Sequence, residues 1–285
     1  MTNVRALALR LLLEYEASEK YVNLSLSSHA TDGLSSDERG LLTSLLYTTV
    51  EHKITYEYYI GAYMGKAVDK LTDHTRAILR LGICQLVDMD RIPQHAAVNE
   101  TVKLAKNSGE RSLVNAILRR VSSGEPLPLP KREKNEARYL SVKYSVPLAT
   151  VKHFIRILGD DTEALLSTFN KTAPLTLAVN TVKISVDDFM KKLEKNGYAP
   201  TRASISPISV KLCGSYNPRE IPGFSEGEFF VQDEASTLAP YILSMDGGER
   251  FIDVCSAPGG KSFALAVMTG DRAHIESADI HESKL

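Results

Sequence analysis

The sequence is poor in residues that stabilise a fold covalently or through a metal. Its 285 residues include three cysteines, Cys84, Cys213 and Cys255, and no two of them form a C-x-x-C pair. Because they are few and far apart in the sequence, they fit neither a disulfide framework nor a zinc site. We therefore expect a protein without metal, from a reducing compartment.

Long apolar runs are also absent. No stretch of 18 consecutive apolar residues occurs, which argues against a membrane-spanning helix. The apolar segment 4–18 is interrupted by Arg10 and Glu14, and no small-residue cleavage site follows it, so a signal peptide is not indicated. No coiled-coil heptads occur. We expect a cytoplasmic monomer that does not bind membranes.

The net charge of −1 conceals an uneven distribution along the chain. Residues 126–212 contain 14 basic and 8 acidic residues, whereas residues 213–285 contain 5 basic and 12 acidic ones. A basic middle between a neutral and an acidic block could be the electrostatic footprint of a nucleic acid. It could equally be a solvated lysine surface.

Helical spacing of apolar residues dominates the first 123 positions. This spacing predicts a compact bundle of about six helices, one of which begins with the capping-box pair Ser35 and Glu38. The segment 124–133 carries three prolines alternating with leucines, which favours an extended linker. Helical patterns return in residues 134–170.

The pattern changes after residue 173. A strand over 174–184, a helix over 185–197 and a strand over 206–213 predict a small α+β module. Further on, a strand over 248–255, a helix over 260–270 and a strand over 272–280 predict the start of a parallel, doubly wound sheet. The predicted domains are thus residues 1–123, 134–226 and 227–285, with residues 124–133 as the linker.

The turn "DVCSAPGGKS", residues 253–262, invites comparison with two phosphate-binding motifs. A P-loop requires glycine where Cys255 stands, and Pro258 removes one backbone N–H. A dinucleotide fingerprint requires spaced glycines, but Gly259 and Gly260 are adjacent. Neither motif fits.

The nucleotide turn of an S-adenosylmethionine (SAM) methyltransferase is a third interpretation. Asp253 ends one strand, the glycines allow the backbone to approach a ligand, and Asp279 ends the next strand. A carboxylate at that second position is able to accept both ribose hydroxyls. A tight turn without a ligand remains the alternative.

Several segments, in the same order, resemble the RNA cytosine-5 methyltransferases of the Sun type. They are "DVCSAPGGKS", "FFVQDEAS" (229–236), "LAVNTVKIS" (177–185), and helical stretches such as "ILRLGICQLVDMDRIPQHAAVNETVKLAK" and "LVNAILRR". The helical stretches look like the NusB-like domain at the front of those enzymes. The resemblance covers nearly the whole chain.

The resemblance implies an all-α NusB-like bundle, an α+β RNA-binding module, and the beginning of an α/β, Rossmann-like SAM methyltransferase domain. It implies methyl transfer to carbon 5 of a cytosine in 16S rRNA, free or in a small-subunit assembly intermediate, through a cysteine adduct at carbon 6. The nucleophilic cysteine is expected after Leu285, so the 285 residues alone are expected to be inactive. The alternative is a non-catalytic, NusB-like RNA-binding protein with a methyltransferase remnant.

The resemblance also implies roles for individual residues. Asp253 is expected to order the turn or to contact the cofactor through water. Lys261 either points toward RNA phosphate or braces its helix, and the lysine helix is either an RNA contact or a solvated face. The expected cofactor-binding residues are Cys255, Ser256, Ala257, Pro258, Gly259, Gly260, Lys261 and Asp279. The candidate RNA contacts are Lys171, Asn180, Lys183, Lys191, Lys192 and Lys195.

Overall fold

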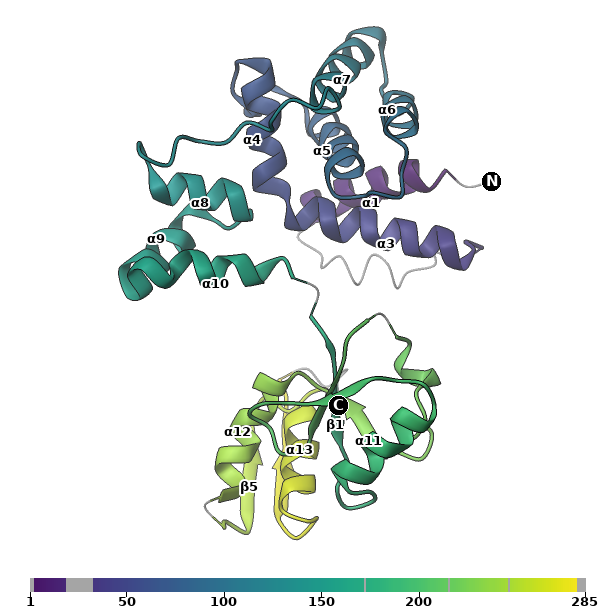
Figure 1. The fold of residues 1–285 in the computed structure, drawn as a ribbon, viewed down its shortest axis with the longest axis vertical. Coiled ribbons are helices and arrows are strands. Elements are labelled where there is room, and N and C mark those ends of the chain that lie inside the picture. Colours follow the sequence, from purple (N-terminus) through teal and green to yellow (C-terminus); the bar gives the residue numbers. More distant parts are fainter. Residues whose placement is uncertain (1–2, 19–32, 172, 215, 246, 281–285) are drawn as a thin grey trace. The chain divides into compact units, whose positions relative to one another are not determined.

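A computed structural model divides the chain into two compact units, residues 1–171 and 172–285 (Figure 1). It describes residues 3–18, 33–171, 173–214, 216–245 and 247–280. The helical pattern predicted across 1–123 therefore has one part, residues 19–32, outside the described residues. Each unit has hydrophobic clusters of its own.

Unit 1 begins with a helical bundle in which one helix is central. Helix α5 contacts every other main helix of the bundle, and its residues from Ala77 to Gln85 are all buried. The capping box predicted at Ser35 is confirmed, because the Ser35 and Glu38 side chains each accept the other residue's backbone N–H. The helices are α1 (Val4–Ser18), α3 (Ser36–Glu51), α4 (Lys53–Met64), α5 (Asp73–Val87), α6 (Gln94–Val102) and α7 (Ser108–Val121), with a 3₁₀ turn η2 (Val68–Lys70).

An ion-pair network around the buried Arg80 side chain joins α1, α4 and α5. The Arg80 side chain is only 3% exposed, and its guanidinium donates to both carboxylate oxygens of Glu16, at 2.8 and 2.7 Å. Lys53 donates to Glu16 at 2.8 Å, and Glu57 lies 3.3 Å from Arg80. Burial raises the pKa of Glu16, but the hydrogen bonds from Arg80 and Lys53 outweigh it and lower that pKa to about 2.

The helices predicted in residues 134–170 are present and belong to unit 1. They enclose a small core of Leu140, Val146, Val151 and Leu166. Helix α8 lies against α4, where the Thr55 hydroxyl donates to the carbonyl of Val142. The elements are α8 (Glu136–Tyr144), α9 (Leu148–Leu158), the 3₁₀ turn η3 (Gly159–Asp161) and α10 (Thr162–Phe169).

Unit 2 contains an antiparallel sheet of order β2-β3-β1-β4. One face is covered by α11, whose Phe189 and Leu193 pack on Leu177 and Val210. The predicted strand–helix–strand is present, and the three-residue strand β2 is an addition that the sequence did not indicate. The elements are β1 (Leu175–Val179), α11 (Val186–Lys195), β2 (Pro200–Arg202), β3 (Ser209–Leu212), the 3₁₀ turn η4 (Pro218–Glu220) and β4 (Phe229–Val231).

The last part of unit 2 is a parallel strand pair with a crossover helix, as predicted. Strand β5 (Arg250–Asp253) pairs with β6 (His274–Ser277), and α13 (Gly260–Met268) connects them. Helices α12 (Glu234–Met245) and α13 lie side by side (Figure 1). Ala264 and Val267 of α13 pack on Ala178 and Ile208, so α13 covers the second face of the antiparallel sheet.

Strand β4 pairs with β1, so the antiparallel sheet extends past residue 226. The domain boundaries predicted at 133/134 and 226/227 stay predictions. No helix in the part of the chain that the structure describes is long and apolar enough to cross a bilayer.

Candidate functional site

The turn after β5 is held in place by the acid that precedes it. One oxygen of Asp253 accepts the backbone N–H of Cys255 at 3.2 Å, and the other accepts the Ser262 hydroxyl at 2.7 Å. The N–H of Ala278 donates to the Asp253 carbonyl at 2.8 Å, which ties the turn to the end of β6. Asp253 therefore orders the turn, which is one of the two roles considered for it.

The second predicted acid lies against the same turn. The backbone N–H of Ala257 donates to a carboxylate oxygen of Asp279 at 3.2 Å. The N–H of Ser256 donates to the carbonyl of Ala278 at 3.0 Å. The parallel pairing of β5 and β6, with Asp253 opposite Ser277, thus brings residues 255–257 together with Asp279.

The local geometry requires a glycine at position 259 and leaves little room for a side chain at position 260. Gly259 has φ of +99°, a conformation that other residues rarely adopt, and a Cβ there would lie 2.9 Å from Cε2 of Phe263. A Cβ on Gly260 would lie 3.2 Å from Nε2 of Gln232. Gly260 is the first residue of α13, so the positive end of this helix faces the turn.

Two buried polar atoms at the turn fit a ligand. Oγ of Ser256 and Oε1 of Gln232 have no hydrogen-bond partner among the described residues, although both side chains are buried. Unpaired buried polar atoms are costly, so their presence at a glycine turn favours a ligand that bonds to them. These residues fit the polar amino-acid and ribose parts of SAM, the cofactor that the sequence predicts.

The structure thus brings the predicted cofactor residues 255–261 and Asp279 together in one turn. Lys261 is exposed and has no ion pair within the described residues, and its two suggested roles stay predictions. Sequence reasoning missed Gln232 and Ser262. Gln232 stands in a quoted segment, "FFVQDEAS", but nothing in that segment indicates that its side chain reaches Gly260.

The first candidate RNA contacts lie on the loop after β1. The backbone N–H of Asn180 donates to the Glu228 carbonyl at 2.8 Å, and its side-chain amide donates to the Gly227 carbonyl at 3.1 Å. The Lys183 ammonium donates to the carbonyl of Glu226 at 2.7 Å. This loop is therefore fixed to the segment 226–228 that precedes β4.

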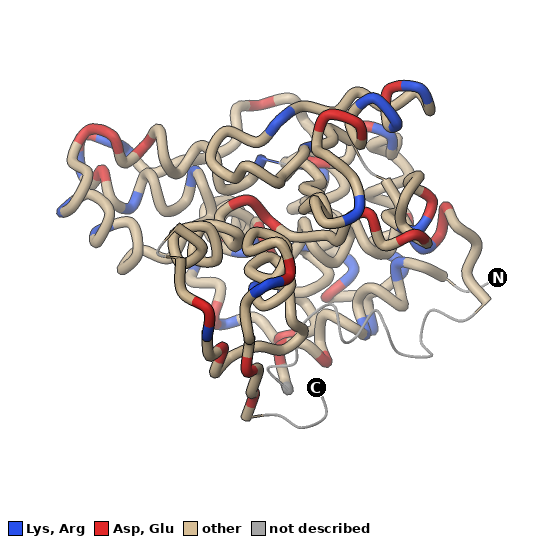
Figure 2. Tube along the Cα trace, turned by 90° about the horizontal axis from the view of Figure 1, so that it is seen from below, with Lys and Arg blue, Asp and Glu red and all other residues tan. Residues whose placement is uncertain are grey.

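The lysines of α11 differ in how their charges are used. Lys192 pairs with Glu228 at 2.8 Å and Lys191 with Asp188 at 3.4 Å. Lys195 and Lys171 are exposed and have no ion pair within the ranges described above. Basic and acidic residues are interspersed along the chain (Figure 2). Lys171 ends unit 1 and the other candidates belong to unit 2, and all six stay predictions as RNA contacts.

The cysteines occupy two kinds of environment. Cys84 is buried on α5, and burial raises the pKa of its thiol to about 11, so it is a packing residue. Cys213, after β3, and Cys255, in the turn, are exposed.

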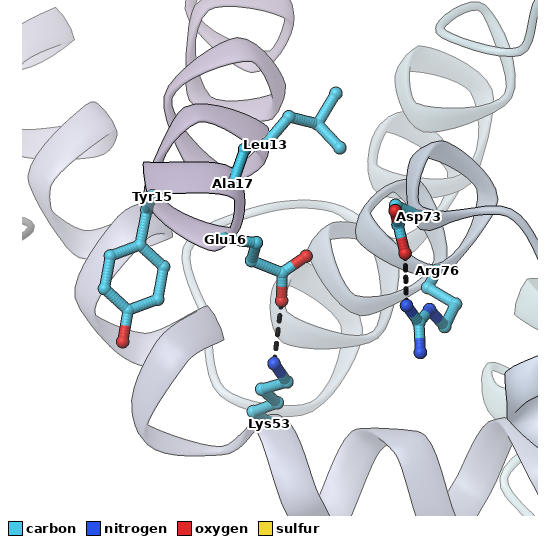
Figure 3. Close-up of a pocket in the computed structure, with 7 residues that line it drawn as sticks. All are labelled: Leu13, Tyr15, Glu16, Ala17, Lys53, Asp73 and Arg76. Atoms are coloured by element: carbon cyan, nitrogen blue, oxygen red, sulfur yellow. Dashed lines mark hydrogen bonds and ion pairs between the residues drawn. The ribbon is translucent and has the colours of Figure 1, made fainter. Parts of the chain in front are cut away.

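A hollow of 660 Å³ in unit 1 is a competing candidate site (Figure 3). Its charged residues are paired with one another, Glu16 with Lys53 and Asp73 with Arg76. The charges in its wall therefore neutralise each other, and we assign the hollow to the ion-pair network rather than to a ligand.

Two family models match the chain. Residues 2–123 match the NusB family, and residues 147–217 match the ferredoxin-like domain of the RsmF/B-like methyltransferases. The chain is 30% identical to the probable ribosomal RNA small subunit methyltransferase B of Bacillus subtilis, over all of this chain and 64% of that protein. It is 29% identical to ribosomal RNA small subunit methyltransferase B of Pseudomonas putida, over 99% of this chain and 64% of that one.

A solved structure shares the fold. The crystal structure of PH0851 matches with a TM-score of 0.69 and 23% identity, over all of this chain and 65% of that one. The chain thus spans less than two thirds of the length of these relatives, 64% of each of the two methyltransferases and 65% of PH0851. The chain therefore carries a match to the NusB family followed by a match to the ferredoxin-like domain of the RsmF/B-like methyltransferases, and it is similar over its whole length to proteins named ribosomal RNA small subunit methyltransferase B.

Proposed function

We propose that the chain is the RNA-binding and cofactor-binding part of an enzyme that methylates small-subunit rRNA with SAM. The observation that carries the proposal is the turn 253–261 together with Asp279 and Gln232, which supply two ordered acids, a glycine with positive φ and two unpaired buried polar atoms. The relatives named as small subunit rRNA methyltransferases support the substrate.

SAM, when bound, supplies an electrophilic methyl group. In this proposal the backbone amides of residues 255–261 and the N-terminus of α13 bind its polar parts. The Asp279 carboxylate accepts the ribose hydroxyls. Asp253 does not need to touch the cofactor, because its two hydrogen bonds already fix the turn that does.

We further propose carbon 5 of a cytosine as the acceptor. This carbon is a poor nucleophile until a thiolate adds to carbon 6 and makes it enamine-like. Once carbon 5 carries the methyl group, loss of its proton and departure of the thiolate from carbon 6 restore the ring. Cys84 is buried, Cys255 belongs to the cofactor turn and Cys213 follows β3 outside that turn, so we propose none of these three as the nucleophile.

The site is tested by titrating SAM into the 285-residue chain and into two variants by calorimetry. Gly259→Ala distorts the turn and Asp279→Asn removes the ribose acceptor, so each should weaken SAM binding by roughly tenfold, about 1.4 kcal/mol. Glu249→Gln, an exposed acid just before β5, is the matched control and should bind as the parent does. Equal affinity in all four proteins would refute the assignment.

A non-catalytic RNA-binding protein is the second candidate, favoured by the NusB match over residues 2–123. It predicts RNA binding that falls linearly with log salt, since Lys and Arg displace counterions. It also predicts no SAM binding by the same calorimetry, which separates the two functions.

A further inference from the structure

A second hollow, of 430 Å³, opens beside the cofactor turn within unit 2. It lies between the loop after β1 and helix α13, and its lining includes Asn180, Lys183, Phe230, Phe263 and Asp271. Its volume is near the lower end of the roughly 300–1,000 Å³ usual for ligand pockets. The proposed function does not use it.

Asn180 supplies a fixed hydrogen-bond acceptor in this wall. Its backbone N–H and its side-chain Nδ2 both donate to the segment before β4, at 2.8 and 3.1 Å, so the amide cannot turn freely. Its Oδ1 is buried and has no hydrogen-bond partner among the described residues. A buried, oriented, unpaired carbonyl oxygen is suited to a ligand that carries an N–H group.

Phe230 and Phe263 supply aromatic surface. Their ring centroids are 6.3 Å apart and the rings are tilted by 56°. Phe263 is 60% exposed, although its neighbour Ala264 is completely buried against the sheet. A phenylalanine left exposed at the mouth of a hollow offers a flat face on which a planar ligand is able to stack.

The polar residues that line the hollow favour a nucleobase over a phosphate as the group bound inside it. Asn180 and Asp271 both line the hollow, and the amide oxygen of one and the carboxylate of the other are acceptors, which disfavours an anion. Lys183 uses one N–H on the Glu226 carbonyl at 2.7 Å, which leaves its charge available for a phosphate outside. The lining therefore suits a neutral, planar ligand with N–H donors and an attached anion.

We propose that this hollow binds one unpaired nucleobase of the RNA, stacked on Phe263 and donating an N–H to Oδ1 of Asn180. Lys183 then contacts a flanking phosphate. The identity of the polymer rests on the proposed function. Because the Phe263 ring lies against Gly259 of the cofactor turn, the bound base sits next to the proposed SAM site.

The test compares two fluorescent oligonucleotides on the 285-residue chain by anisotropy. One is single-stranded cytidine RNA of about six nucleotides, and the other is an abasic strand of the same length. We expect the base-bearing strand to bind roughly tenfold more tightly. Phe263→Ala and Asn180→Ala should each reduce that advantage about fivefold, and Phe263→Ala should leave abasic binding unchanged, because Phe263 contacts only the base in this proposal.

Two further variants guard against loss of folding. Phe263→Tyr keeps the aromatic face and should retain the advantage. Ile242→Ala removes a similarly exposed side chain (55%) on α12, away from the hollow, and should also retain it. The inference is overturned if Phe263→Ala and Asn180→Ala bind both strands as the parent does; RNA binding itself then still stands. If the parent binds neither strand, the RNA part of the proposed function fails as well.

Discussion

The buried network around Arg80 gives the sharpest stability prediction. Glu16→Gln keeps the size of the side chain but removes the charge that faces Arg80 and Lys53. Breaking a buried ion pair costs about 3–5 kcal/mol, since the remaining charge is left uncompensated. Glu57 stays 3.3 Å from Arg80, and glutamine still accepts one hydrogen bond, so we expect the lower end, about 3 kcal/mol.

Urea unfolding followed by circular dichroism measures this loss. In a domain of this size, about 3 kcal/mol corresponds to a fall in Tm of about 6–12 °C. Arg10→Gln is the control on the same helix, because the Arg10–Glu14 pair is largely exposed and spans 3.8 Å; it should cost less than about 0.5 kcal/mol. If Glu16→Gln costs no more than this control, the network does not stabilise the bundle.

The ion pairs of Glu16 also predict that the free energy of unfolding depends on pH. The pKa of Glu16 is about 2 in the folded chain, against 4.5 for an unperturbed glutamate. A lowered folded pKa contributes stability that is complete above the unfolded value and is lost as pH falls toward the folded one. The difference in the free energy of unfolding between the parent and Glu16→Gln should therefore be constant above about pH 5 and shrink between about pH 4.5 and pH 2. A difference that stays constant down to pH 2 would contradict the assigned pKa.

Two other predictions concern the bundle. A Cβ on Gly82 would lie 2.6 Å from both methyl carbons of Leu118, so Gly82→Ala should destabilise by about 1–3 kcal/mol in urea, whereas Gly40→Ala, with open space around it, should not. An aromatic disulfide reagent should react quickly with the two exposed thiols of the native chain and with Cys84 only after denaturation. The reason is that Cys84 is buried and burial raises the pKa of its thiol to about 11. Three fast-reacting thiols would show that α5 is not packed as described.

The sequence predicted elements whose signals are local. Helix spacing and the Ser35–Glu38 box depend on residues three or four apart, and the structure confirms them. Asp253 and Asp279 were predicted together because parallel strands place their carboxyl ends at one edge.

Other features depend on partners far away in the chain. Strand β1 alternates in sequence as a half-buried strand does, but four of its five residues are buried, because α13 covers the face that α11 leaves open. Strand β2 is three residues long and begins with Pro200; it forms because β3 offers it an edge. The sequence suggests RNA or solvent as the surroundings of Lys192. Its ion pair with Glu228 depends on a residue 36 positions further along the chain, which no local pattern indicates.

The pairing of β4 with β1 limits where related genes are able to exchange segments without breaking the fold. A division at residue 226 would strip one edge of the antiparallel sheet and leave Ala178 and Ile208 without the helix that covers them. The segment that contacts RNA in our proposal and the parallel strand pair β5–β6 belong to one compact unit. Exchange of segments between related genes should therefore be better tolerated between residues 171 and 172, where one compact unit ends and the next begins, than at residue 226.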